Sequence, residues 1–142
     1  MTSRVLISTS RYYEDISAEL EAGAQEVLDA AGLITETIVV PGAFEVPGVI
    51  AMAADSSRFD GYVALGCVIR GETSHYDYVC GESSRGLMTL AVERRLAIGY
   101  GILTVENRDQ AWVRADRKQK NKGRDAAEAC IAMLELRKKC VG

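Results

Sequence analysis

The chain has a single histidine, His75, in a segment whose residue types suit proton transfer beside an anion. The segment Gly66–Tyr78 runs from an apolar stretch through Arg70, Gly71 and two hydroxyl residues. An imidazole titrates near neutral pH, and the N–H groups at the start of a helix bind phosphate. If a helix begins near Glu72–Ser74, His75 lies one turn inside it, close to such an anion. The alternative is a histidine that faces solvent or caps the helix.

A second segment places an aromatic ring beside a carboxylate, between the only two prolines of the chain. This segment, Pro41–Pro47, displays Phe44 and Glu45. A planar heterocycle could stack on the phenyl ring while Ala43 and Glu45 bind its edge or a polar tail. The alternative is that Phe44 packs in the core and Glu45 caps a helix. The segment Ser8–Tyr13 also offers hydroxyl and aromatic groups, but it lacks the glycines of a dinucleotide-binding fingerprint.

A run of basic residues near the C-terminus could supply charge to an anionic substrate. Its members are Arg114, Arg117, Lys118, Lys120 and Lys122. Arginine can bind a phosphate through two parallel hydrogen bonds, whereas lysine contributes a point charge. A run of this kind is more commonly the solvated end of a helix, and that alternative stays open.

The elements that must position these residues alternate between β-rich and helical patterns. Strands are predicted at Arg4–Thr9, Thr35–Val40, Tyr62–Leu65 (which could continue to Ile69) and Gly101–Val105. Helices are predicted around Ile16–Ala31, from near Glu45–Pro47 to Ala54, and at Tyr76–Leu96, Asn107–Ala115 and Asp125–Lys139. Wholly apolar strands that alternate with helices indicate a parallel sheet covered on both faces. The expected fold is therefore α/β, a three-layer α/β/α sandwich with a four-stranded parallel sheet, in one domain over residues 1–142.

The loops that follow the four strands should lie together, because ligands of such sheets bind at the carboxyl ends of the strands. These loops are Ser8–Tyr13, Pro41–Pro47, Arg70–Tyr76 and Val105–Gln110. The segments with candidate chemistry are thereby expected at one edge of the sheet.

Composition argues against several classes of protein. The net charge of −3 is unusual for a nucleic-acid binder, and no apolar run approaches the length needed to cross a membrane. The first apolar run already reads as a strand, so we expect no secretion signal. The cysteines at 67, 80, 130 and 140 form no Cys-x-x-Cys pair. We therefore expect buried, reduced thiols in a cytoplasmic protein, and no metal site.

Taken together, these segments resemble the 6,7-dimethyl-8-ribityllumazine synthase family. The similarity covers nearly the whole chain and rests on four pieces in matching order: Pro41–Pro47, Gly66–Tyr78, Gly101–Asn107 with Gln110 and Ala111, and Asn121–Gly123. The resemblance implies a flavodoxin-like sandwich and a transferase of riboflavin biosynthesis. It would condense 5-amino-6-(D-ribitylamino)uracil with 3,4-dihydroxy-2-butanone 4-phosphate to 6,7-dimethyl-8-ribityllumazine in the penultimate step, releasing phosphate and water. No metal and no cofactor are implied.

The resemblance also implies a role for individual positions. Tyr12 corresponds to the aromatic residue that stacks on the pyrimidine, and His75 to the proposed proton-transfer residue. The pyrimidine and ribityl site would consist of Ala43, Phe44, Glu45, Cys67, Val68 and Ile69. Glu72 and Thr73 match the phosphate-binding turn, and Arg114 the arginine supplied to that phosphate. Tyr100 and Lys122 match positions near a subunit interface, with Tyr100 contributed by a neighbouring subunit.

Three positions depart from the usual pattern of the family. Tyr12 and Tyr100 add a hydroxyl where phenylalanine is frequent, which would make the pocket slightly more polar. Glu72 puts a carboxylate beside the phosphate turn. Only Met1–Ser3 precede the first strand, where relatives often have an extension that pairs with a neighbour's sheet.

The family forms pentamers with active sites between subunits, and some members build shells of twelve pentamers. We therefore expect a homopentamer with small-molecule substrates, and no nucleic-acid or membrane partner. An icosahedral shell and an association with riboflavin synthase stay open. The alternatives are a non-catalytic flavin- or lumazine-binding module and a purely structural shell protein. Ser8–Tyr13 lacks the phosphate loop of a flavodoxin, and a shell protein would not need His75 and Arg114 beside these loops.

Overall fold

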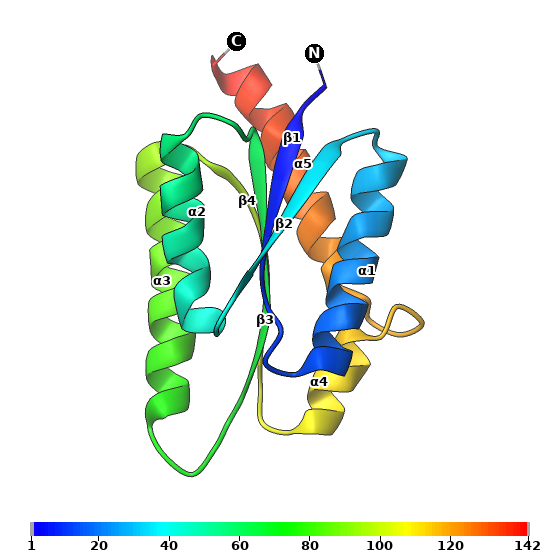
Figure 1. The fold of residues 1–142 in the computed structure, drawn as a ribbon, viewed down its shortest axis with the longest axis vertical. Helices are drawn as coiled ribbons and strands as arrows, with labels where there is room; N and C mark the ends of the chain where they lie inside the picture. Colours follow the sequence, from blue (N-terminus) through cyan, green and yellow to red (C-terminus); the bar gives the residue numbers. More distant parts are fainter. Residues whose placement is uncertain (1, 142) are drawn as a thin grey trace.

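The structure, a computed structural model, describes residues 2–141 as a parallel sheet between two layers of helices (Figure 1). Its elements are β1 (Arg4–Ser10), α1 (Glu14–Ala30), β2 (Ile34–Val40), the 3₁₀ turn η1 (Ala43–Glu45), α2 (Val46–Asp55), β3 (Gly61–Ile69), α3 (His75–Arg94), β4 (Ala97–Val105), α4 (Arg108–Ala115) and α5 (Lys122–Val141). The strand order is β2-β1-β3-β4. Helices α2 and α3 cover one face, and α1, α4 and α5 cover the other (Figure 1). The predicted three-layer α/β/α sandwich with a four-stranded parallel sheet is confirmed.

The central strands β1 and β3 are buried on both faces, as their continuous apolar sequences predict. Side chains alternate between the two faces, so each strand supplies two hydrophobic cores. Val5 and Val63 pack in the core beneath α1, α4 and α5. Leu6 and Tyr62 pack in the core beneath α2 and α3. The sheet therefore holds the loops at its carboxyl edge on a rigid base.

The edge strand β4 is longer than predicted, because helix α5 lies directly against its glycines. A Cβ atom on Gly99 would be 1.8 Å from the carbonyl oxygen of Ala126, so the helix can approach only a residue without a side chain. The strand predicted at Gly101–Val105 begins instead at Ala97. Leu96, predicted as the end of α3, instead precedes β4, since α3 ends at Arg94 and Arg95 turns the chain with a φ of 55°.

Helix α5 also begins earlier than predicted, at Lys122 rather than Asp125. The reason is the same kind of close approach. A Cβ atom on Gly123 would be 2.1 Å from the carbonyl oxygen of Leu20 on α1. Gly123 therefore lets the first turn of α5 pack directly against α1.

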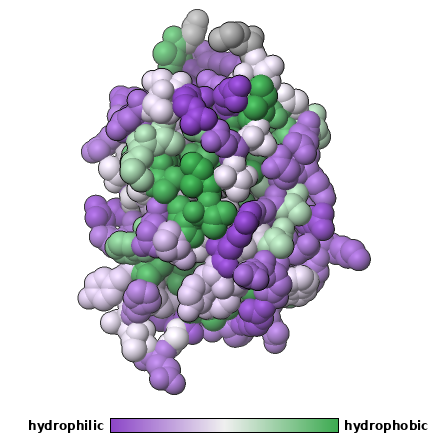
Figure 2. All heavy atoms as spheres, viewed as in Figure 1, coloured by the Kyte–Doolittle hydropathy of each residue, from purple (hydrophilic) through white to green (hydrophobic). Residues whose placement is uncertain are grey.

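The other edge strand, β2, carries apolar side chains on the surface. Figure 2 shows apolar side chains gathered near the centre of the face that β2 and α2 present to the viewer. Exposed apolar residues on these two elements include Ile34, Val39 and Met52. The outer side of β2 pairs with no other strand of the described residues. An unpaired strand edge beside apolar surface is a place where another chain can join.

The structure also bears on the expectations about a membrane-spanning segment and about the cysteines. Within residues 2–141, no helix is both long and apolar enough to cross a membrane. Cys67 and Cys130 are buried, as expected for the thiols, and Cys80 is half-buried. The expectation of burial is wrong for Cys140, which is exposed near the end of α5.

Candidate active site

An open pocket of about 600 Å³ lies at the carboxyl ends of the strands. Of the residues predicted to form the site, those that line it are Tyr12, Ala43, Phe44, Glu45, Cys67, Val68, Ile69, Thr73 and His75. They come from three of the four loops predicted at this edge and from the end of β3, which supplies Cys67, Val68 and Ile69. The fourth loop, Val105–Gln110, also lies at this edge, where the carbonyl oxygen of Val105 accepts from the N–H of Arg70 at 2.9 Å, but it contributes no lining residue. This loop leads into α4, which packs with α1 and β4 instead.

The floor of the pocket is formed where β1, β3 and η1 meet. A Cβ atom on Gly66 would lie 3.5 Å from the Cβ of Ala43 and 3.6 Å from the Cβ of Ser10. Ser10 is 1% exposed, and its Oγ is the buried side-chain oxygen without a hydrogen-bond partner among the described residues. Leaving such a hydroxyl unpaired costs about 1–3 kcal/mol. Ser10 belongs to the hydroxyl-bearing segment Ser8–Tyr13 but was not predicted as a site residue, although a hydroxyl at the end of a buried strand was a usable signal.

Two aromatic rings of the pocket are open to solvent. Tyr12 is 74% exposed and Phe44 is 52% exposed. Glu45, at the residue before α2, makes no capping hydrogen bond with its side chain. The alternative interpretation of Pro41–Pro47, a packed phenyl ring and a capping carboxylate, is therefore wrong. Exposed rings within a concave site are available to stack on a planar ligand.

The turn between β3 and α3 puts His75 at the first residue of the helix. The prediction that His75 lies one turn inside α3 is wrong, because the chain needs Gly71–Ser74 to pass from the strand to the helix. The N–H of His75 donates to Oγ1 of Thr73 at 3.3 Å. The N–H groups of Glu72 and Ser74 find no protein acceptor among residues 2–141 and remain free for an anion. Glu72 itself does not line the pocket.

Arg70 binds the ends of this turn together. Its guanidinium lies 3.0 Å from the carboxylate of Glu106, 3.5 Å from that of Asp77 and 4.2 Å from the ring centre of Tyr76. These contacts join the end of β3, the residue after β4 and the first turn of α3. The arginine that precedes the histidine in sequence therefore fixes the turn, with its charge already paired inside the chain.

Burial governs the titration of the thiol in the pocket wall. Desolvation raises the pKa of the Cys67 thiol from 9.0 to about 12, against a smaller lowering by the nearby Arg108. Burial also raises the pKa of Tyr13. Both groups are neutral at physiological pH. Cys67 therefore lines the pocket as a small uncharged side chain, without the thiolate that a nucleophile requires.

Besides Glu72, three predicted site residues lie outside the pocket. Tyr100 is on the edge strand β4 and is 45% exposed. Arg114, near the end of α4, donates to the carbonyl oxygen of Gln110 at 3.0 Å, and Lys122 pairs with Asp125 at 3.3 Å. Within one chain, none of the three lines the pocket that contains His75.

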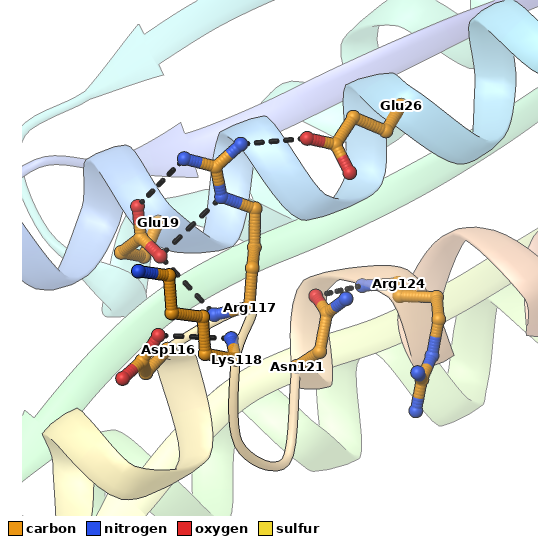
Figure 3. Close-up of polar contacts among 7 residues, drawn as sticks. All are labelled: Glu19, Glu26, Asp116, Arg117, Lys118, Asn121 and Arg124. Atoms are coloured by element: carbon orange, nitrogen blue, oxygen red, sulfur yellow. Dashed lines mark hydrogen bonds and ion pairs between the residues drawn. The ribbon is translucent and has the colours of Figure 1, made fainter.

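The connection between α4 and α5 is bound to α1 by Arg117. Its guanidinium reaches Glu19 at 3.2 Å and Glu26 at 2.6 Å, and its backbone N–H donates to Glu19 at 3.1 Å (Figure 3). Asn121, with a φ of 48°, then accepts a hydrogen bond from the N–H of Arg124 at 3.4 Å (Figure 3). Three members of the basic run, Arg114, Arg117 and Lys122, thus have separate partners within the chain. The contacts of Arg117 with α1 fix the position of Lys122 relative to α4.

Comparison with known proteins gives a consistent result. Residues 2–138 match the family model described as 6,7-dimethyl-8-ribityllumazine synthase. A protein of that name from Sphingopyxis alaskensis is 55% identical over 135 residues, covering 95% of each chain. Another from Novosphingobium aromaticivorans is 53% identical and covers 96% of this chain and 98% of its own. A third, from Agrobacterium fabrum, is 52% identical and covers 97% of both.

Among solved structures, the lactose-specific IIB component domain of the phosphotransferase system from Streptococcus pneumoniae is 16% identical, with a TM-score of 0.32. The alignment covers 95% of this chain and 97% of that one. No conclusion rests on a likeness at this level.

Proposed function

Because the chain belongs to the 6,7-dimethyl-8-ribityllumazine synthase family, we propose that it condenses 5-amino-6-(D-ribitylamino)uracil with 3,4-dihydroxy-2-butanone 4-phosphate. The product is 6,7-dimethyl-8-ribityllumazine, and phosphate and water are released. This is the penultimate step of riboflavin biosynthesis. The structural observation that best supports it is a pocket that combines exposed aromatic rings with a histidine at the start of a helix.

The pyrimidine occupies the aromatic part of the pocket. Its ring stacks on Tyr12 or Phe44, the two exposed rings of the lining. The wall formed by Cys67, Val68 and Ile69 meets the ring edge, and the carboxylate of Glu45 accepts hydrogen bonds from the ribityl hydroxyls. The Glu45 carboxylate makes no capping hydrogen bond and is therefore available to the hydroxyls, and the neutral thiol of Cys67 suits contact with the ring edge.

The phosphate of the second substrate binds at the turn before α3. The free N–H groups of Glu72 and Ser74 and the positive end of the helix dipole favour an anion there. The hydroxyl of Thr73 borders the same place. Glu72 contributes its backbone, and its side chain lies outside the pocket lining, which removes the conflict between a carboxylate and a phosphate.

His75 moves protons during the reaction. The substrate amine attacks the ketone carbon and water leaves, which forms an imine. Loss of a proton from the imine then allows the carbon–oxygen bond to break, and phosphate departs with the bonding electron pair. Tautomerisation and ring closure follow, with loss of water. His75 serves as the acid or base, a contribution of about 10²–10⁴ in rate, while holding two substrates together contributes several kcal/mol.

A second copy of the chain completes the pocket. Tyr100, Arg114 and Lys122 lie outside their own chain's pocket, and we place them in the pocket of a neighbouring subunit of a homopentamer. Arg114 then meets the substrate phosphate. The apolar surface beside the unpaired edge of β2 supports association between copies. We also place the protein in the cytoplasm, where its reduced thiols persist.

The direct test mixes both substrates with the purified protein and follows the green-fluorescent lumazine. We expect product well above the uncatalysed rate. Light scattering on the same sample should give the mass of a pentamer or of an assembly of pentamers. No product above the uncatalysed rate would favour a lumazine- or flavin-binding protein, and a monomeric mass would contradict the shared site.

A further inference from the structure

The helix that follows the first pocket loop begins without a capping side chain. Tyr13 occupies the residue before α1, and it makes no capping hydrogen bond. Serine, threonine, asparagine or aspartate at this position would be more favourable by about 1 kcal/mol. The Tyr13 ring instead lines the pocket and meets the ring of Tyr12 edge-on, with centroids 4.9 Å apart. The start of α1 therefore needs another group to hold it.

That group is Arg108, which is 93 residues from Asp15 in the sequence. It pairs with the carboxylate of Asp15 in the first turn of α1, and its guanidinium carbon lies 5.9 Å from the ring centre of Tyr13. Arg108 is itself the first residue of α4, where a positive charge is unfavourable beside the helix dipole. The contacts with Asp15 and Tyr13 therefore explain why an arginine is found here, since a positive charge does not stabilise the start of α4.

The Tyr13 ring also packs against the core beneath α1, α4 and α5, whereas Tyr12 is 74% exposed. Within residues 2–141, neither tyrosine hydroxyl takes part in a hydrogen bond. The neighbouring bonds, from Ser17 Oγ to the Ser10 carbonyl oxygen at 2.8 Å and from Arg11 to Glu21 at 2.8 Å, hold the end of β1 and stop short of the rings. Core packing therefore holds the buried side of Tyr13, and Arg108 is the charged group that contacts its ring.

We propose that Arg108 is a positioning residue for the heterocycle, holding Asp15 and Tyr13 so that the Tyr12–Tyr13 pair presents a fixed stacking surface. This inference rests on the proposed function. Arg108 does not line the pocket, so it acts through Tyr13. Both ends of the ion pair are about half exposed, 54% for Arg108 and 51% for Asp15, so the pair adds little to folding. Its effect is therefore on binding of the pyrimidine substrate.

The test measures kcat and both KM values for Arg108→Ala, Asp15→Asn, their combination, and the exchanged pair Arg108→Asp with Asp15→Arg. We expect each single variant to raise the KM for the pyrimidine about fivefold. The KM for the butanone phosphate and kcat should stay within about twofold, because the other substrate and His75 are untouched. The combination should be no worse than either single variant, and the exchanged pair should recover most of the loss.

A matched control lies at the opposite end of the sheet. Arg58 pairs with Glu36 at 2.7 Å and lies 5.0 Å from the ring centre of Phe59, so it makes the same two kinds of contact away from the pocket. Arg58→Ala should leave both KM values unchanged, with the assembly mass checked by light scattering. An equal rise in the pyrimidine KM for Arg58→Ala would overturn the inference, as would additive losses without recovery in the exchanged pair.

The inference and the proposed function can fail separately. If the wild-type protein makes lumazine and Arg108→Ala binds the pyrimidine as tightly as wild type, only the inference fails. If the wild-type protein makes no lumazine, the proposed function fails. In that case the dissociation constant of the pyrimidine, measured by calorimetry, still decides the role of Arg108: a rise of about fivefold in Arg108→Ala supports it and an unchanged value overturns it.

Discussion

The pocket and the α4–α5 connection differ in what their side chains are bonded to. In the pocket, the rings of Tyr12 and Phe44 are exposed, and the hydroxyl of Ser10 has no partner among the described residues. In the connection, Arg117 is held by two carboxylates of α1, and Asp116 accepts from the backbone of Lys118 at 2.9 Å (Figure 3). One region leaves groups available to a ligand. The other uses its polar groups to bind the chain to itself.

Packing around glycines shows the same difference. A Cβ atom on Gly71, in the turn beside the pocket, would meet nothing within 4 Å. A Cβ atom on Gly123 would lie 2.1 Å from a backbone oxygen of α1. The pocket loop therefore has room to accept substrate, whereas the connection is a close-packed support. Lys122 is therefore positioned by the packing of the connection against α1. The pocket of its own chain plays no part in its position.

The largest effect is expected from adding a methyl group to each of these glycines. Gly123→Ala should lower the free energy of unfolding by about 3 kcal/mol, since α1 and α5 must move apart. Gly71→Ala should change it by no more than about 0.5 kcal/mol, because its Cβ points into open space. Urea unfolding followed by circular dichroism measures both. Equal destabilisation by the two variants would show that the two regions do not differ in packing.

A smaller effect is expected from removing the imidazole. His75→Ala should lower kcat about a hundredfold and leave the KM values nearly unchanged, since general acid–base catalysis is worth this order and positioning persists. The fold should be unaffected, because the structure gives the side chain no packing role. Steady-state kinetics and a thermal melt check the two statements. A complete loss of turnover would mean that proton transfer is indispensable and positioning secondary.

The sequence predicts the architecture well because the signals for it are local. Apolar runs such as Arg4–Thr9 and Tyr62–Leu65 indicate buried parallel strands without any knowledge of their neighbours. The loops at the carboxyl ends follow from that topology, and all four lie at this edge, although only three contribute lining residues to the pocket. The exposed Phe44 was undecided from sequence, because exposure depends on what the rest of the chain covers.

The errors arise where the deciding contact is distant in sequence. The start of β4 depends on the carbonyl of Ala126, and the start of α5 on that of Leu20. Arg117 looked like part of an anion site because its partners on α1 are more than ninety residues away. The roles of Tyr100 and Lys122 came from the family resemblance alone, since a site shared between copies leaves no pattern in a single sequence.

The smallest of the three effects tests whether Arg114 belongs to the pocket of another copy. Arg114→Ala should raise the KM for the butanone phosphate about tenfold, the loss expected for one charge-assisted hydrogen bond, and leave the pyrimidine KM unchanged. Unchanged kinetics for the butanone phosphate would refute the role of Arg114.

Mixed assemblies separate a shared site from a site within one chain. In a pentamer that contains both His75→Ala and Arg114→Ala chains, some pockets keep His75 from one chain and receive Arg114 from its neighbour. Co-expression of the two variants should therefore give more activity at low butanone phosphate than the average of the two separate proteins. An activity equal to that average would mean that His75 and Arg114 act from the same chain. Because Arg114 donates to its own helix at Gln110 and does not line its own pocket, we expect the higher value.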